Sequence, residues 1–375
     1  MAYQYWRYEI LDRLCMDAFQ RFGFTMGESG IIRDVLLMSD MYGIESHGMQ
    51  RMVRYHKGIE RGMIKVGAKP EVVFETPVSA VIDGHDGMGQ LIGRQAMEIA
   101  IRKAKDSGVG IVSVRNSNHY GIAGYYANMA CREGLMGFSC TNSEAIMVPT
   151  FGRLAMLGSN PIACAFPAEP YDFFFDASTT VVTRGKLEMY NKLEKPLPEG
   201  WALDREGHPS TNAPEVLANI VAKRGGGIMP LGGSTEQLGS HKGYGYGMLC
   251  EIFSSILSLG ATSNYCMTGG RGNICHGFAA VNPAFFGDPQ VIKAHFSKYL
   301  QELREAPTVD GQKKIYTHGE KEIAAMAERR AKGIPVNNNT MVEIWDLCQH
   351  LGLDFSAYFG DYRPIVKEDV FKGNY

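Results

Sequence analysis

Residues 108–121 read GVGIVSVRNSNHYG, and this stretch decides how the chain folds. Its apolar run, Gly110–Val114, is typical of a buried strand that starts after a turn at Gly108. A polar loop, Arg115–Gly121, follows directly and leads into apolar residues at helical spacing. A buried strand that passes through a short loop into a helix is the repeating unit of α/β proteins.

The flanking sequence extends this unit in both directions. An amphipathic helix is predicted before Gly108, and a strand at 135–140 follows the next helix after short links. This order predicts helices layered on a largely parallel sheet. The segment 244–259 is apolar nearly all round, which predicts a helix buried in the middle of the protein. Further strands are predicted at 71–75, 79–83, 162–166, 173–176 and 277–283.

The two ends of the chain show helical patterns instead. Apolar residues recur at a 3.6-residue period from Trp6 to Phe22, and helical patterns return from Pro289 onward. The N-terminal segment therefore looks all-helical. We expect three parts: a helical N-terminal segment (1–66), a central α/β body (67–288), and a mainly helical C-terminal segment (289–375) that packs with the N-terminal one.

Composition limits the class of protein. The chain has 375 residues, 45% hydrophobic and 21% charged, which is typical of a globular protein. A net charge of −2 lacks the basic excess of a nucleic-acid binder. No apolar run approaches the ~18 residues of a membrane span, and the N-terminus lacks a signal-peptide pattern. The eight cysteines form no CxxC pair, so we expect no metal site and reduced thiols in a cytoplasmic protein.

Common nucleotide and catalytic motifs are absent. Gly87-x-Gly89 is followed by Gly93, one residue too late for a Rossmann fingerprint. The sequence has no P-loop, no HExxH zinc motif and no GxSxG nucleophile elbow. An ordinary Rossmann dehydrogenase is therefore disfavoured.

Two histidines in polar, Gly-flanked turns are candidates for proton transfer. His119 lies between the predicted strand and helix, where α/β sheets bind ligands and a helix N-terminus favours a neutral imidazole. His47 lies in a turn between helices, and Arg51 could face the same site if a helix begins near Ser46. A guanidinium can hold a substrate carboxylate through two hydrogen bonds. The alternative is that both histidines cap turns and Arg51 is a surface residue.

Several loops of small residues could line a cofactor. Asp176–Thr180 follows a predicted strand, and Gly158–Pro161 precedes one. Lys242 lies near the N-terminus of a predicted helix, where a phosphate would bind. The turn His318–Glu320 begins another helix. Each of these signals is weak on its own.

Eight segments stand in a fixed order along the chain: Gly43-Ile-Glu-Ser-His-Gly-x-x-Arg51, Asp83-Gly-x-x-Gly-x-Gly-Gln, Asn118-His-Tyr-Gly, Gly158-Ser-Asn-Pro-Ile, Asp176-Ala-Ser, Arg184-Gly-Lys, Pro230-Leu-Gly-Gly and His241-Lys-Gly-Tyr-Gly. In this order they resemble the type 2 malate/L-lactate dehydrogenase family. That family also includes enzymes acting on sulfolactate, ureidoglycolate and diketogulonate, and reductases of cyclic imines. The resemblance covers nearly the whole chain, from about residue 5 to residue 350.

The resemblance implies NAD(H) or NADP(H) bound by the central body of a non-Rossmann α/β fold. A mixed central sheet would carry helices on its faces and be flanked by a helical lobe from the two chain ends. The family also implies a homodimer with its site near the subunit interface. The position of His119 is assigned as proton acceptor in some members and that of His47 as proton donor in others, so either histidine could be the acid/base here. The arginine that matches Arg51 is expected on the substrate carboxylate. The cofactor contacts implied are Ser143, Asp176, Ala177, Ser178, Lys242, His318, Gly319 and Glu320.

Two departures from the family pattern affect the cofactor rim. The family usually has Pro where this chain has His318, and the loop Ser234–Ser240 is longer than in some members. Both bear on the choice between NAD and NADP.

We therefore expect reversible oxidation of a small 2-hydroxy acid to its 2-oxo acid, with malate and oxaloacetate as the leading pair. Arg54 or Arg184 could bind a second carboxylate. The alternatives on this scaffold are a cyclic imine carboxylate reductase, or a lactate, sulfolactate or ureidoglycolate dehydrogenase. A nicotinamide-binding protein without catalysis is a further alternative. So is a metal hydrolase built on His47 and His119, which lacks a third ligand nearby in the sequence.

Overall fold

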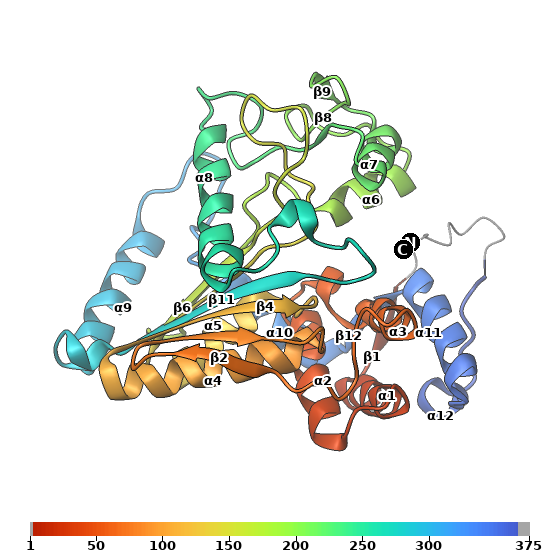
Figure 1. The fold of residues 1–375 in the computed structure, drawn as a ribbon, viewed down its shortest axis with the longest axis horizontal. Helices are drawn as coiled ribbons and strands as arrows, with labels where there is room; N and C mark the ends of the chain where they lie inside the picture. The colour runs from red at the N-terminus through yellow and green to blue at the C-terminus, as the bar shows by residue number, and fades with distance from the viewer. Residues whose placement is uncertain (1–2, 367–375) are drawn as a thin grey trace. The chain divides into compact units, whose positions relative to one another are not determined.

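A computed structural model describes residues 3–366, and the chain divides into two compact units (Figure 1). The first unit combines residues 3–67 with 302–366, and the second comprises 68–301. The outermost residues of the two expected terminal segments, 1–2 and 367–375, lie outside the described residues. Each unit is described by itself.

The second unit is built on a seven-stranded mixed sheet, which confirms the mixed sheet that the family resemblance implied. Only the β3–β4 pair is parallel, so the expectation of a largely parallel sheet is wrong. In spatial order the strands are β2 (Glu71–Glu75), β3 (Ser79–Asp83), β4 (Val109–Ser117), β11 (Ile274–Val281), β5 (Met136–Thr141), β6 (Ile162–Phe166) and β7 (Phe173–Ala177).

One late strand explains this difference. Strands β4 and β5 are joined through helix α5 (Ala123–Arg132) and run in the same direction, as the sequence predicted. Strand β11 lies between them, antiparallel to both, with Phe278 opposite Val112 on one side and Ser139 on the other. A strand contributed from so far along the chain carries no local signal of where it inserts.

Helices cover both faces of this sheet (Figure 1). On one face, helix α4 (Gly89–Ser107) packs so closely that a Cβ on Gly110 would lie 2.1 Å from the carbonyl oxygen of Ala100. On the opposite face, the Ser113 hydroxyl donates to the Phe253 carbonyl, 2.8 Å away. Residues 110 and 113 point to opposite faces because side chains alternate along a strand. Helix α8 (Ser240–Glu251) and the π-helical turn η3 (Ile252–Ile256) therefore lie on the second face.

The segment 244–259 is not buried all round, so that expectation is wrong. Its inward face carries small and polar residues, among them Gly247, Glu251 and Ser254. Its apolar side chains face outward: the exposed fractions are 50% for Tyr246 and 46% for Leu249. Apolar composition alone did not reveal which face packs on the sheet.

The rest of the second unit contains a smaller layer with its own apolar cluster around Leu187, Val216 and Ile228. Its elements are α6 (Arg184–Lys192), β8 (Ala202–Leu203), β9 (Pro209–Ser210), α7 (Ala213–Ala222) and β10 (Gly227–Ile228), with the sheet order β10-β8-β9. The short helices η4 (Ser263–Tyr265) and η5 (Pro283–Phe285) and helix α9 (Pro289–Glu305) follow. Helix α9 starts at the expected boundary, but residues 289–301 cluster with the second unit.

The first unit is mostly helical, but the expectation of an all-helical N-terminal segment is wrong. Strand β1 (Tyr3–Trp6) pairs antiparallel with β12 (Ile334–Asn337), which joins the two ends of the chain. The helices are α1 (Tyr8–Arg21), α2 (Met26–Met41), η1 (Glu45–His47), η2 (Met49–Arg51), α3 (Met52–Glu60), α10 (Glu320–Lys332), α11 (Asn338–Leu351) and α12 (Ser356–Phe359). None of the helices among residues 3–366 is both long and apolar enough to cross a membrane.

Candidate active site

One edge of the large sheet gathers most of the predicted site residues of the second unit. The register pairs Asp83 with Arg115, Ser117 with Ile274, and Thr141 with His276. Likewise Ile162 lies opposite both Cys140 and Ala177. The carboxyl ends of β3, β4, β5 and β7 therefore meet at this edge. Asp176 and Ala177 end β7, and the segments that follow the strands carry His119, Ser143 and Ser178.

His119 is held in place through its two neighbours in the loop between β4 and α5. Asn118 is buried, and its amide donates to the carbonyls of Asp86 (2.9 Å) and Gly87 (3.0 Å). Tyr120 is also buried, and its ring stacks on Tyr126 at 4.7 Å between ring centroids. His119 itself is only half-buried, so a rigid loop presents a partly accessible imidazole.

A second histidine supports this loop, and our sequence reasoning missed it. His276 is fully buried on β11, with Nδ1 2.8 Å from the Thr141 hydroxyl and Nε2 2.8 Å from the Ser117 hydroxyl. Its ring stacks on Tyr120 at 4.2 Å. Desolvation lowers the pKa of His276 to about 3, so the ring is neutral at ordinary pH. A histidine inside an otherwise apolar strand is the signal that could have found it.

Asp176 connects the end of β7 to the helix that starts beside His119. Its carboxylate accepts a hydrogen bond from the backbone amide of Gly124, 2.7 Å away, in the first turn of α5. A carboxylate at a helix N-terminus is stabilised by the helix dipole. Just after β7, the Ser178 hydroxyl donates a hydrogen bond to the Thr180 carbonyl, 3.2 Å away.

Ser143 fixes the loop in front of β6. Its hydroxyl accepts from the Ser159 amide at 3.1 Å, and a Cβ on Gly158 would lie 2.1 Å from that hydroxyl. Beneath this loop, Asn160 donates to the buried carboxylate of Glu251 at 3.0 Å. Glu251 therefore links α8 to the sheet edge.

The start of α8 carries an exposed lysine beside a tightly packed glycine loop. Its N-cap residue, Gly239, has φ +87° and makes no side-chain capping bond. Lys242 is exposed in the first turn. A Cβ on Gly243 would lie 2.3 Å from the Leu231 carbonyl oxygen, so the preceding loop packs directly on this turn. The positive end of a helix dipole, with an adjacent ammonium, is a place where an anion such as a phosphate can bind.

In the first unit, His47 and Arg51 are connected through Ser46. The Ser46 hydroxyl lies 2.8 Å from His47 Nδ1, and Arg51 Nε donates to the Ser46 carbonyl at 2.5 Å. Residues 45–51 form two 3₁₀ turns, and α3 begins only at Met52. Extended backbone at Gly48 separates the two turns, so no α-helix begins near Ser46 and the condition for helical spacing of His47 and Arg51 is not met. Ser46, and not helical spacing, relates the two side chains.

Charge and burial keep His47 neutral. Desolvation, followed by the positive charges of Arg51 and Arg54, lowers its pKa to about 3. The turn itself is anchored by buried Asp40, whose carboxylate accepts from the Met49 amide at 2.8 Å. Desolvation raises the pKa of Asp40 to about 7, although the Met49 bond and the Arg329 charge oppose this shift.

The turn His318–Glu320 also lies in the first unit, at the start of α10. His318 is exposed, whereas Gly319 and Glu320 are buried. The Glu320 carboxylate accepts from the amide and the hydroxyl of Thr317, each at 2.9 Å, and pairs with Lys314. Glu320 therefore fixes the turn, and His318 is its accessible side chain.

Comparison with known proteins agrees with this fold. The Malate/L-lactate dehydrogenase family matches residues 6–344. Malate dehydrogenase of Pyrococcus horikoshii is 42% identical over 336 residues, which cover 89% of this chain and 92% of that protein. L-sulfolactate dehydrogenase of Methanocaldococcus jannaschii is 35% identical, covering 92% and 97%. A crystal structure of malate dehydrogenase from Entamoeba histolytica has a TM-score of 0.91 at 33% identity, covering 94% and 99%.

The class of protein follows from the fold and from these matches: it is a 2-hydroxy-acid dehydrogenase, an oxidoreductase that needs a nicotinamide cofactor. More narrowly, the chain belongs to the malate/L-lactate dehydrogenase family.

Proposed function

We propose that this enzyme interconverts malate and oxaloacetate with NAD or NADP as the hydride carrier. The observation that carries the proposal is the position of His119, half-buried in a rigid loop beyond the carboxyl end of β4. Malate is chosen because two of the similar proteins, at 42% and 33% identity, are named malate dehydrogenase. Lactate, sulfolactate and ureidoglycolate remain the alternative substrates on this scaffold.

His119 is the proposed base. In the oxidation direction it takes the proton of the substrate hydroxyl; a nicotinamide bound beside C2 would supply the hydride acceptor. Proton transfer by a positioned histidine contributes about 10²–10⁴-fold to the rate. Asn118 and Tyr120 hold the loop, so the imidazole needs little reorganisation before the step.

His47 is the proposed hydrogen-bond donor to the C2 oxygen, and Arg51 holds the C1 carboxylate. With a pKa near 3, His47 is uncharged at neutral pH and polarises the oxygen as a neutral imidazole. Its Nδ1 lies 2.8 Å from the Ser46 hydroxyl, and we assign the contact with the C2 oxygen to Nε2. The first carboxylate binds Arg51 through the guanidinium nitrogens that Ser46 does not engage.

A dicarboxylate needs a second cation, and we assign this role to Arg54. Its charge is one of the two that lower the pKa of His47, so it lies close to the proposed oxygen site. The other candidate, Arg184, is paired with Glu144 at 3.4 Å and with Glu188 at 3.0 Å. Competition from two carboxylates makes Arg184 the weaker choice.

We assign the central unit as the nucleotide-binding body. Lys242 and the first turn of α8 would hold the pyrophosphate, whereas Ser143, Asp176, Ala177 and Ser178 line the sheet edge. In the first unit, His318, Gly319 and Glu320 are the remaining proposed cofactor contacts. Here the bound cofactor supplies only the hydride; the protein binds and orients it.

We also propose a homodimer that covers the outward face of α8 and η3. This face exposes large apolar side chains, whereas the face against the sheet carries Glu251 and Ser254. Monomers rarely expose a contiguous apolar patch of this kind. The exposed members of the face are Tyr246, Met248, Leu249, Ile252, Ile256 and Leu257.

We also propose the cytoplasm as the compartment of this enzyme. All eight cysteines are free thiols, which supports a reducing compartment.

The test is initial-rate oxidation of NADH and of NADPH by the purified protein with a panel of acceptors. The panel holds oxaloacetate, pyruvate, sulfopyruvate, diketogulonate and a cyclic imine carboxylate. The proposal predicts the highest kcat/KM with oxaloacetate. A higher kcat/KM with another 2-oxo acid would replace the substrate but keep the reaction. Turnover of the imine alone would replace the reaction itself.

A further inference from the structure

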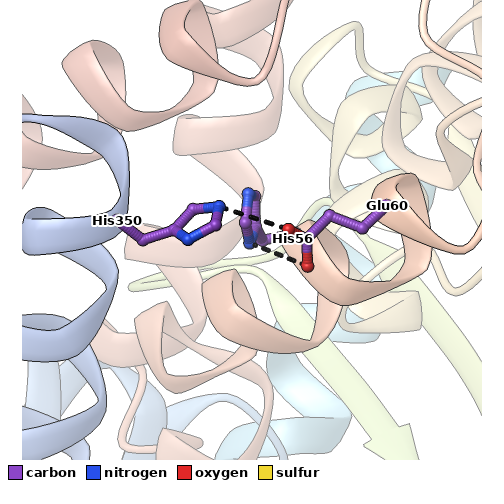
Figure 2. A group of neighbouring side chains, drawn as sticks. All are labelled: His56, Glu60 and His350. Carbon is purple, nitrogen blue, oxygen red and sulfur yellow. Dashed lines mark ion pairs between the residues drawn. The ribbon is translucent and has the colours of Figure 1, made fainter.

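A cluster of three potential metal ligands lies in the first unit, apart from the residues assigned to catalysis (Figure 2). His56 and Glu60 come from successive turns of α3, and His350 comes from the last turn of α11. Figure 2 shows both imidazoles directed toward the Glu60 carboxylate. One ligand atom from each of the three residues lies within 4.8 Å of the other two.

The separations fit the coordination shell of a small divalent metal. His56 Nδ1 lies 3.6 Å from Glu60 Oε2, and His350 Nε2 lies 3.2 Å from Glu60 Oε1. Ligands at 2.0–2.1 Å from a tetrahedral zinc stand about 3.4 Å apart. The two measured distances bracket that value. The two distances run to different oxygens of Glu60, so binding of one ion requires the three ligand atoms, now within 4.8 Å of one another, to draw together.

Packing and electrostatics favour a cation at this place. The His56 ring is held between the ring of Phe22, 4.8 Å away, and the ring of His350, 4.9 Å away. Only 13% of the His56 side chain is exposed, so its ring is fixed before any ion binds. Glu60 is the last residue of α3, where a carboxylate is disfavoured by the negative end of the helix dipole. A divalent cation would relieve this repulsion.

We propose that His56, Glu60 and His350 form a binding site for a divalent transition metal of the zinc type, which clips α3 to α11. Two imidazoles and one carboxylate are a donor set that zinc accepts, with water in the fourth position. The site is not part of hydride transfer. Helix α3 directly follows the turn that carries Arg51. A metal bound by α3 and α11 would therefore link the segment that carries Arg51 to the C-terminal segment.

The experiment uses the full-length protein, stripped with a chelator and titrated with Zn²⁺ by calorimetry. Substitution with Co²⁺ then reports ligand geometry through its visible absorption. We expect one ion per chain. We also expect a rise in Tm of about 3 °C at a hundredfold excess over Kd, because the ion binds the folded state. The variants His350→Ala and Glu60→Gln should each weaken binding by at least about tenfold, since even outer-shell partners of metal ligands contribute 10–100-fold.

The matched control is His208→Ala. His208 also lies beside a carboxylate four residues away, Asp204 at 3.6 Å, but among residues 3–366 no third ligand completes a cluster there. The proposal requires that this variant bind like the wild type. It is overturned if wild type binds no ion at one per chain, or if His350→Ala and His208→Ala bind Zn²⁺ equally.

Discussion

The carboxylate of Asp176 accepts a hydrogen bond from the backbone amide of Gly124, 2.7 Å away, and so joins the end of β7 to the first turn of α5. The loop that carries His119 enters this same helix. Asp176 therefore orients the helix start on which the proposed base depends, besides lying at the edge where the cofactor would bind. Its removal should affect stability and catalysis together.

We predict that Asp176→Ala lowers the free energy of unfolding by about 1–2 kcal/mol, the cost of losing a helix-capping carboxylate. It should also lower kcat/KM at least tenfold. The control is Asn212→Ala, which removes the side-chain cap of α7, a 3.2 Å bond to the Glu215 amide. The control should lose similar stability and keep its activity. Equal kinetics in the two variants would remove Asp176 from the site.

Replacing the proposed base should abolish most turnover. We predict that His119→Ala lowers kcat by about 10²–10⁴-fold, because the hydroxyl proton loses its acceptor. Cofactor affinity, measured by fluorescence titration of the nucleotide, should stay within a few-fold of wild type. The exposed His295 on α9 provides a control substitution. A kcat within a few-fold of wild type would transfer the role of base to His47.

Arg51 should act on the substrate more than on the fold. A lost charge-assisted hydrogen-bond pair costs about 1.5–3 kcal/mol, so Arg51→Gln should lower kcat/KM roughly 10–100-fold. Its Tm should change little, since among the described residues Arg51 bonds only to the Ser46 carbonyl. Steady-state kinetics with oxaloacetate measure the effect. Unchanged KM and kcat would show that the carboxylate binds elsewhere.

Buried His276 should make the protein sensitive to acid. Its pKa is about 3 when folded and near 6.5 when unfolded, so below pH 6.5 the unfolded chain binds a proton that the folded chain does not. The stability that depends on neutral His276 is fully present above pH 6.5 and is lost progressively as the pH falls toward 3. The slope from this group is up to about 1.4 kcal/mol per pH unit.

Urea unfolding at pH 7, 6 and 5 tests this effect in wild type and in His276→Gln. His47, whose pKa is also lowered to about 3, contributes in both proteins, so the difference in slope belongs to His276. Per pH unit, the His276→Gln variant should lose less free energy of unfolding than the wild type. This difference in slope is expected whatever the variant's free energy of unfolding at pH 7. Identical slopes would mean that His276 titrates normally in the folded protein.

The outward face of α8 should hold the dimer together. Leu249→Lys places a charge in the proposed interface, and we expect it to convert a dimer into a monomer in light scattering coupled to size-exclusion chromatography. Leu249 is 46% exposed in the single chain, so the substitution should not disturb its core. Leu238→Lys, at an exposed loop position outside α8, is the control. A wild-type protein that is monomeric at micromolar concentration contradicts the proposed dimer.

Local elements were predictable from sequence where periodicity and turn residues agree. The predicted strands 71–75, 79–83 and 162–166 have the observed bounds. Pairing was not predictable, because β11 inserts between β4 and β5 from far along the chain. Strands β1 and β12 have four residues each, too few to show an alternating pattern. In addition, Pro335 lies within β12, and a proline argues against a strand in sequence analysis.

The candidate site divides in the same way. His119 was placed correctly between strand and helix, because an apolar run and a polar loop are local signals. His276 escaped notice because its partners, Ser117 and Thr141, come from other strands. His350 escaped for the same reason, since its neighbour Glu60 lies near the opposite end of the chain. The site residues that the sequence could not predict are those whose contacts join segments far apart in the chain, whatever their residue type.

Hydride transfer to C2 of a 2-oxo acid is the central claim, and isotope transfer tests it most directly. The purified enzyme is incubated with oxaloacetate and NADH or NADPH deuterated at the C4 position of the nicotinamide, using each of the two stereoisomers. Mass spectrometry and NMR of the product then locate the label. We predict malate with one deuterium at C2 from one stereoisomer of the cofactor and none from the other. Cofactor oxidation without deuterium at C2 of malate would contradict the account.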